Sequence, residues 1–148
     1  MNDKTKHIGL FVGSFDPFTE GHASIVRRAL AFVDSVVIGI GVNPDKHYLF
    51  SVDERRDAIE RRYGDEERVS VVAYEGLTAD LARRLGACCL IKGVRNAADL
   101  EYERLQADFN RSHGIETVLL PAEPHLVDVS STKEREKIRQ QNNNPYQS

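Results

Sequence analysis

The sequence predicts an α/β fold, with one five-stranded parallel sheet and helices on both of its faces. Short apolar segments alternate with longer amphipathic or charged segments along the chain, which is the pattern of successive βαβ units. The segment 35–42 (SVVIGIGV) is a nearly continuous apolar run, typical of a parallel strand that is covered on both faces. The length of 148 residues suits one domain.

The expected elements alternate from the beginning of the chain to its end. We expect strands at 8–12, 35–42, 69–74, 88–91 and 117–120. We expect helices at 22–33, 51–63, 77–85, 98–111 and 131–140. In the first helix Val26, Leu30 and Val33 lie at helical spacing, and Ser51 with Glu54 forms a capping box at the start of the second.

The remaining segments are expected to be turns, solvated surface or tail. Gly86 ends the third helix, and residues 92–96 form a turn after the fourth strand. The charged run 54–56 is expected to be a solvated helix face. Residues 1–140 are therefore predicted to form the domain, and the polar, low-complexity segment 141–148 a mobile tail.

Composition and charge argue against several classes of function. The net charge is −3 and no basic patch stands out, so we expect neither a nucleic-acid nor a membrane surface. No apolar stretch approaches ~18 residues, and the polar segment 1–7 is not a signal peptide. Cys88 and Cys89 are adjacent without a C-x-x-C motif, so we expect two buried strand thiols in a cytoplasmic protein.

The segment 13–22 (GSFDPFTEGH) carries the strongest functional signal, because it joins the first strand to the first helix. Gly13 and Gly21 let the backbone approach a ligand or take positive φ. Unpaired N–H groups at a helix start attract anions, so the Ser14 hydroxyl and the His22 imidazole would join them around a phosphate. The alternative is a glycine-rich turn that only caps a helix.

The ordered pattern G-x-F-D-P-x-x-x-G-H resembles the signature of the nucleotidylyltransferases with a Rossmann-like fold. Their H-x-G-H element corresponds to residues 19–22, with Thr19 in the first position as in the bacterial phosphopantetheine adenylyltransferases. The segments N-P-D-K, L-I-K-G-V-R-N-A-A-D-L-E-Y-E and V-S-S-T follow in order at suitable separations. The resemblance to that family runs from about residue 8 to residue 135.

Polar and cationic side chains follow every expected strand. Ligands of parallel sheets bind outside the carboxyl ends of the strands, so one cleft can collect these side chains. They are Ser14, Lys46, Thr78, Lys92 with Arg95, and Ser130 to Thr132, after the first to the fifth strand respectively.

Nucleotidyl transfer needs positioning and charge neutralisation, and these residue types supply both. His22 is the candidate for stabilising the α-phosphate in the transition state, and Ser14 for binding the acceptor phosphate. Lys46 and Lys92 would hold the same phosphate, and the Arg95 fork would clamp the β- or γ-phosphate. Solvated surface lysines and an ordinary N-cap at 130–132 are the alternatives.

The family resemblance implies attack of 4′-phosphopantetheine on the α-phosphate of ATP, without a covalent enzyme intermediate, giving dephospho-coenzyme A and pyrophosphate. It implies that ATP is surrounded by Ser14, Phe15, His22, Gly93, Val94, Arg95, Glu103, Leu126, Val127, Asp128, Val129, Ser130, Ser131 and Thr132. It implies that 4′-phosphopantetheine contacts Ser14, Lys46, Thr78 and Lys92. Mg²⁺ carried with the nucleotide, a homohexamer and feedback inhibition by coenzyme A are implied in the same way.

Three positions depart from the usual family pattern. Lys92 stands where the family usually has arginine, so the charge is kept but the bidentate geometry is lost. Ser14 replaces the commoner threonine and keeps the hydroxyl. After Thr132 the charged run 133–136 stands where the family usually has apolar residues followed by Arg-Glu, so the last helix has lost part of its apolar face.

Two other functions stay open at this point. One is a different small nucleotidylyltransferase, such as a cytidylyltransferase for glycerol 3-phosphate. The other is a nucleotide-binding regulatory module without turnover, which the altered last helix would allow. A class I aminoacyl-tRNA synthetase shares the H-x-G-H logic, but 148 residues leave no room for a tRNA-binding domain.

Overall fold

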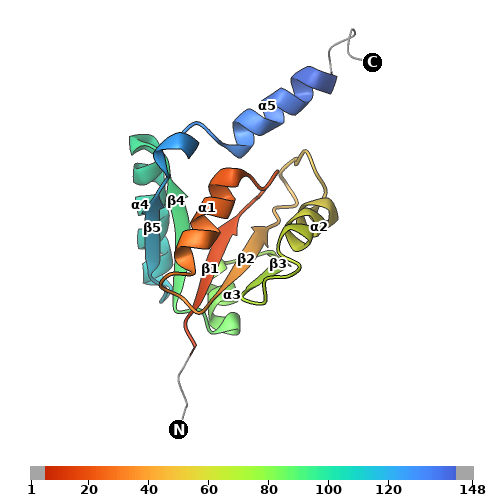
Figure 1. The fold of residues 1–148 in the computed structure, drawn as a ribbon. Helices are drawn as coiled ribbons and strands as arrows, with labels where there is room; N and C mark the ends of the chain where they lie inside the picture. Colours follow the sequence, from red (N-terminus) through yellow and green to blue (C-terminus); the bar gives the residue numbers. More distant parts are fainter. Residues whose placement is uncertain (1–5, 143–148) are drawn as a thin grey trace.

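The computed structural model describes residues 6–142 and confirms the predicted α/β class (Figure 1). Parallel strands form one five-stranded sheet in the order β3-β2-β1-β4-β5. The strands are β1 (Ile8–Gly13), β2 (Ser35–Gly41), β3 (Val69–Tyr74), β4 (Cys89–Val94) and β5 (Thr117–Pro121). The helices are α1 (Glu20–Ala29), α2 (Val52–Arg62), α3 (Thr78–Leu85), α4 (Ala97–Ser112) and α5 (Ser131–Asn142), with a 3₁₀ turn η1 (Pro124–Leu126).

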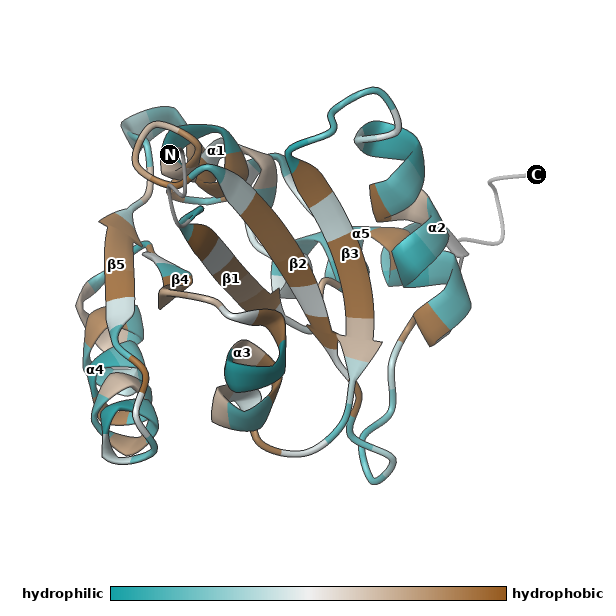
Figure 2. Ribbon diagram, turned by 90° about the horizontal axis from the view of Figure 1, so that it is seen from below, coloured by the Kyte–Doolittle hydropathy of each residue, from teal (hydrophilic) through white to brown (hydrophobic). Residues whose placement is uncertain are grey.

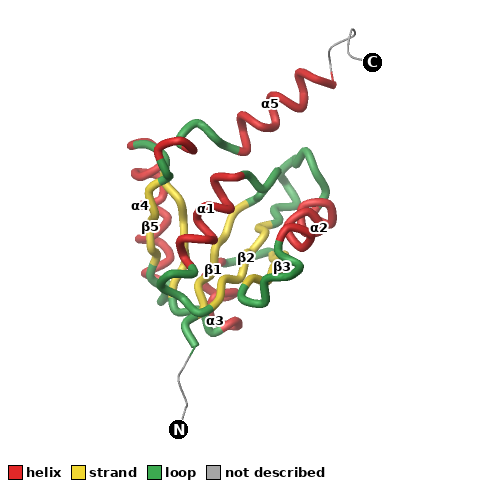
Figure 3. Tube along the Cα trace, in the orientation of Figure 1, coloured by secondary structure: helices red, strands yellow, loops and turns green. Residues whose placement is uncertain are grey.

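The strand order places a reversal of the chain beside β1. The chain moves outward from β1 through β2 to β3, and then returns to β4 on the other side of β1. Such a switch point opens a crevice at the carboxyl ends of the two central strands. Helix α5 crosses beyond this edge of the sheet, as Figures 1 and 3 show.

The core lies in two layers, one on each face of the sheet. On one face Phe11 and Ile38 pack with Ile25 of α1 and Ile59 of α2. On the other face Leu10, Val12 and Val37 pack with Leu81 and Ala82 of α3. Figure 2 shows α4 on the same side as α3. Neighbouring residues of β1 therefore supply both layers, which explains why this strand is apolar throughout.

Helix α1 is shorter than expected at its carboxyl end and begins two residues earlier. The sequence predicts 22–33, but the helix runs Glu20–Ala29 and Thr19 caps it. After Ala29 the chain makes tight turns, in which the N–H groups of Phe32 and Val33 donate to the Ala29 carbonyl. Val33 is still buried in the core, so its apolar character reports packing within a turn rather than helix.

Strand β4 is longer than predicted, because it includes Lys92, Gly93 and Val94 of the expected turn. These residues pair in register with 119–121 of β5, so tertiary pairing overrides the low strand propensity of Lys and Gly. The strand starts at Cys89, which is buried, whereas Cys88 precedes it and is exposed. The expectation of two buried strand thiols is therefore wrong for Cys88.

Two predicted helix-end signals are confirmed. The capping box of Ser51 and Glu54 is present, and Gly86 ends α3 with a φ of 70°.

Helix α5 extends to Asn142, two residues into the predicted tail, and residues 143–148 of that tail lie outside the described part of the chain. Within residues 6–142 no helix has the length and apolar character needed to cross a membrane.

Candidate active site

Two adjacent cavities lie at the carboxyl edge of the sheet, around the switch point. The larger cavity has a volume of about 350 Å³ and the smaller about 210 Å³. Both are lined by Val12 and Gly13 at the end of β1, by Lys92 of β4 and by Glu103 of α4. The cavities therefore adjoin, with these four residues as their shared wall.

The larger cavity brings together all the residues that the family resemblance assigns to the acceptor. Ser14 follows β1 directly, Lys46 lies in the loop after β2, Thr78 is the first residue of α3, and Lys92 lies within β4. The Thr78 hydroxyl lies 2.8 Å from the Tyr74 hydroxyl, which also lines the cavity. Separate strand tips thus contribute hydroxyl and ammonium groups to one space.

The smaller cavity collects most of the residues that the resemblance assigns to the nucleotide. It is lined by Phe15, His22, Gly93, Val94, Arg95, Glu103, Leu126, Val129, Ser130 and Ser131. Ser14 lines only the larger cavity. Val127 and Asp128 are exposed and line neither cavity, and the Thr132 hydroxyl accepts a hydrogen bond from Arg135 (3.0 Å). The nucleotide roles of all the residues named by the resemblance stay predictions.

His22 is fixed by the first turn of α1. The Thr19 backbone N–H donates to His22 Nδ1 (2.9 Å), and the His22 N–H donates to Thr19 Oγ1 (3.3 Å). This reciprocal pair is a capping box in which histidine takes the place of Glu or Gln. Because the Thr19 N–H can only donate, Nδ1 must accept, and the neutral ring carries its proton on Nε2.

The surroundings of His22 keep the imidazole neutral. Burial lowers its pKa to about 4, and the nearby positive charges of Lys92 and Arg95 contribute to the shift. The ring packs against Phe15 and Phe18, with centroid distances of 4.9 and 5.3 Å. At pH 7 the side chain is therefore an uncharged hydrogen-bond donor beside two cations.

Phe15 holds the left-handed conformation that the sequence would assign to a glycine. Its φ is 49°, and its ring is only 2% exposed. Within the described residues Gly13 and Gly21 do not have positive φ. An L-residue rarely adopts this conformation, so the packed ring is what maintains it, and such strain concentrates at functional sites.

Arg55 was expected in a solvated helix face, and this expectation is wrong. The side chain is 3% exposed and donates to the Ser14 carbonyl (2.9 Å) and the Phe50 carbonyl (3.1 Å). Its guanidinium lies 4.0 Å from the centre of the Tyr48 ring. The sequence did carry a signal for this burial, because Arg55 is four residues, or one helical turn, from the buried Ile59.

Asp16 and α5 fix the loop after β1 from two further sides. The buried Asp16 carboxylate accepts hydrogen bonds from the N–H groups of Leu49 (2.8 Å) and Phe50 (2.9 Å). Ser131 Oγ donates to the Pro17 carbonyl (2.8 Å), and Arg135 donates to the Asp16 carbonyl (2.8 Å). The start of α5 is therefore attached to the loop that carries Ser14 and Phe15.

Comparisons with known proteins show to which family the chain belongs. A family model described as cytidylyltransferase-like matches residues 10–137. The phosphopantetheine adenylyltransferase of Porphyromonas gingivalis is 49% identical over 90% of this chain and 88% of its own length. That of Streptococcus pneumoniae is 42% identical over 94% of this chain and 86% of its own. The chain belongs to the phosphopantetheine adenylyltransferase family.

Solved structures of low sequence identity share the family's fold. A bifunctional NMN adenylyltransferase/ADP ribose pyrophosphatase from Francisella tularensis, complexed with AMP and a manganese ion, superposes with a TM-score of 0.66 at 16% identity. The match covers 95% of this chain and 43% of that longer protein. A lipopolysaccharide core biosynthesis protein from Thermoplasma volcanium gives a TM-score of 0.56, over 80% of this chain and 98% of that one.

We predict that the His22 ring titrates with a midpoint about 4 and is neutral, with its proton on Nε2, at pH 7. Nitrogen-15 NMR of the ring across pH 3–8 measures both properties, and His22→Ala assigns the signals. A midpoint near the ordinary value of about 6.5, or a proton on Nδ1 at neutral pH, would contradict the environment described for this ring.

We predict that Arg55→Met lowers the free energy of unfolding by at least about 2 kcal/mol, because it leaves carbonyls without their donor. Urea unfolding at one fixed protein concentration measures the change. The matched control is Arg56→Met, because the Arg56 side chain is partly exposed and its one ion pair within residues 6–142 is with Asp53 (2.6 Å). Equal destabilisation by the two substitutions would show that Arg55 does not hold the loops.

Proposed function

We propose that this chain transfers AMP from ATP to 4′-phosphopantetheine, and releases dephospho-coenzyme A and pyrophosphate. The observation that carries the proposal is the wall shared by the two cavities, formed by Val12, Gly13, Lys92 and Glu103. ATP occupies the smaller cavity and the acceptor the larger one. Family membership supports this choice of substrates.

The reaction is an in-line attack of the acceptor phosphate on the α-phosphate of ATP. The attacking phosphate is already ionised near neutral pH, so the site needs no strong general base. Holding both reactants in the attack geometry can supply ~7–11 kcal/mol of the barrier. Cavities that meet at one wall provide this geometry, because each ligand is held by its own set of strand tips.

His22 donates from Nε2 to the oxygens of the α-phosphate as negative charge develops there. Because its pKa of about 4 leaves the ring neutral at pH 7, and a neutral imidazole holds its remaining N–H proton tightly, His22 acts as a hydrogen-bond donor rather than as an acid. The contact to Thr19 fixes the ring before the substrate arrives. A donor held in this way stabilises the transition state more than the ground state.

The cations divide between the two substrates. Arg95 lines only the smaller cavity and neutralises the β- or γ-phosphate, which leaves as pyrophosphate. Lys46 and Ser14 line only the larger cavity and bind the acceptor phosphate. Lys92 lines both, and so stands where the acceptor oxygen approaches the α-phosphate. Thr78 contacts the rest of the acceptor.

Mg²⁺ enters with ATP as part of the substrate. Within residues 6–142 no group of three or more His, Cys, Asp or Glu side chains could hold a metal ion. The carboxylates Asp99 and Glu103 that line the cavities are paired with Arg95 and Lys92, so phosphate oxygens and water supply most of the Mg²⁺ ligands. The ion then adds positive charge on the polyphosphate, which the protein complements with Arg95.

The proposal includes a homohexamer in the cytoplasm that coenzyme A inhibits. Exposed apolar side chains on α4, namely Leu100, Tyr102, Leu105 and Phe109, support contacts between subunits. Coenzyme A carries the same pantetheine arm as the acceptor, so it competes for the larger cavity. The free thiols of Cys88 and Cys89 suit a reducing compartment.

We predict that pyrophosphate is released only when purified protein receives ATP, Mg²⁺ and 4′-phosphopantetheine together. A coupled pyrophosphate assay measures this, with CTP replacing ATP and glycerol 3-phosphate replacing the acceptor as controls. Release with CTP and glycerol 3-phosphate would instead identify a cytidylyltransferase. Tight ATP binding without release in any mixture would identify a regulatory module.

The variant His22→Ala tests the chemical step in the same assay. It should reduce kcat by about 10²–10³, the typical effect of removing one transition-state donor, and leave the Kd for ATP within a few-fold. An equal loss of turnover and of ATP binding would overturn the role of His22 as a transition-state donor.

A further inference from the structure

Helix α4 carries two carboxylates, Asp99 and Glu103, one helical turn apart. They lie beside Arg95, which follows β4, and Lys92, which lies within β4. Asp99 Oδ2 lies 3.1 Å from Arg95 Nε, and Glu103 Oε2 lies 3.4 Å from Lys92 Nζ. Asp99 and Glu103 both line the smaller cavity, and Glu103 also lines the larger one. The cations proposed to bind phosphate are therefore already paired in the protein.

Each contact uses only one side of the cation. Asp99 Oδ2 accepts a hydrogen bond from the Arg95 backbone N–H (3.1 Å) and forms an ion pair with Arg95 Nε. Within residues 6–142 the terminal nitrogens of Arg95 have no hydrogen-bond or ion-pair partner, so the fork is left for a ligand. Lys92 Nζ contacts Glu103 and the Val12 carbonyl (3.3 Å), and an ammonium has three N–H donors.

The Glu103 contact is electrostatic rather than directional. Glu103 is 9% exposed, and its Oε2 has no hydrogen-bond partner among the described residues although Lys92 lies near. A buried carboxylate is costly unless a charge compensates it, so Glu103 keeps the ammonium in the shared wall. Asp99, in contrast, holds Arg95 at two points, its backbone by a hydrogen bond and its guanidinium by an ion pair at Nε.

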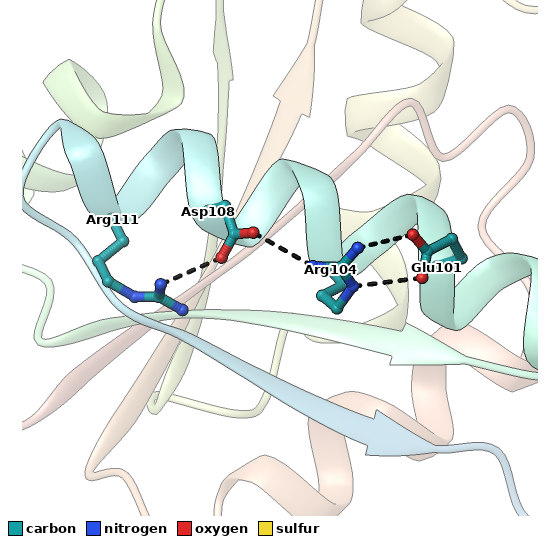
Figure 4. Close-up of polar contacts among 4 residues, drawn as sticks. All are labelled: Glu101, Arg104, Asp108 and Arg111. Atoms are coloured by element: carbon teal, nitrogen blue, oxygen red, sulfur yellow. Dashed lines mark hydrogen bonds and ion pairs between the residues drawn. The ribbon is translucent and has the colours of Figure 1, made fainter.

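The outer face of α4 carries a different kind of ion pair. Glu101, Arg104, Asp108 and Arg111 form a chain of exposed contacts along that face (Figure 4). Exposed pairs of this kind contribute little, because water and salt screen them. Glu101 on the same helix can therefore serve as a control, because its carboxylate contacts no cation that lines a cavity.

We propose that Asp99 and Glu103 are positioning residues, which hold Arg95 and Lys92 with their remaining donors free for phosphate. The proposal rests on the proposed function. It adds Asp99 to the site and assigns to Glu103, which the family resemblance places beside ATP, a role that acts through Lys92. Asp99 serves the ATP side alone, because Arg95 lines only the smaller cavity. Glu103 serves both substrates, because Lys92 lines both cavities.

We predict that Asp99→Asn weakens ATP binding by about tenfold and leaves the KM for the acceptor within twofold, since misoriented groups lose up to about 10²-fold. Glu103→Gln should raise both KM values. Glu101→Gln is the control, and should change neither KM nor the oligomeric state measured by sedimentation. Titration calorimetry with Mg·ATP measures the Kd for ATP in the absence of any acceptor. The result therefore remains informative if the proposed acceptor is wrong.

A double-mutant cycle separates positioning from a structural role. If Asp99 acts only through Arg95, then Asp99→Asn has no further effect on ATP affinity in an Arg95→Gln background. The same loss in both backgrounds would overturn the proposal, as would Asp99→Asn binding ATP like Glu101→Gln. Absence of ATP binding by the unaltered protein would instead count against the proposed function.

Discussion

The site depends on one constraint, which is that two cavities must share a single wall. The wall exists because β1 and β4 are neighbours at the point where the chain reverses direction across the sheet. Their carboxyl ends bring Val12 and Gly13 beside Lys92, and α4 adds Glu103 from one side. Two phosphorylated molecules can then lie in separate cavities and still meet. In a sheet with another strand order, β1 and β4 would not be neighbours and these groups would lie in separate crevices.

The charges of the site are balanced around this wall rather than simply gathered there. Lys92 and Arg95 each have a carboxylate partner on α4, and together with burial they keep His22 neutral. A neutral imidazole adds a donor without adding a third positive charge. Elsewhere Arg55 holds the Ser14 loop by its carbonyl oxygens, so a cation serves structure there and not the substrate.

Much of this arrangement could be predicted from local sequence, because its signals are local. Gly86 and the Ser51 capping box mark helix ends through single residues and short spacings. The predictions failed where distant residues decide the outcome. Lys92 belongs to a strand because β5 pairs with it, and Arg55 is buried because the loop after β1 needs its donors. The pairing of Asp99 with Arg95 was hidden because an acid near a helix start has a simpler explanation.

The stereochemical course at the α-phosphorus of ATP tests the shared wall most directly. The protein is given 4′-phosphopantetheine and ATP that carries sulfur at the α-phosphorus in one configuration, and the configuration of the product is determined. Substrates that meet end to end across the wall react by one displacement, so the account predicts inversion. Retention would require two displacements through a covalent enzyme intermediate, and would contradict the direct meeting of the two phosphates.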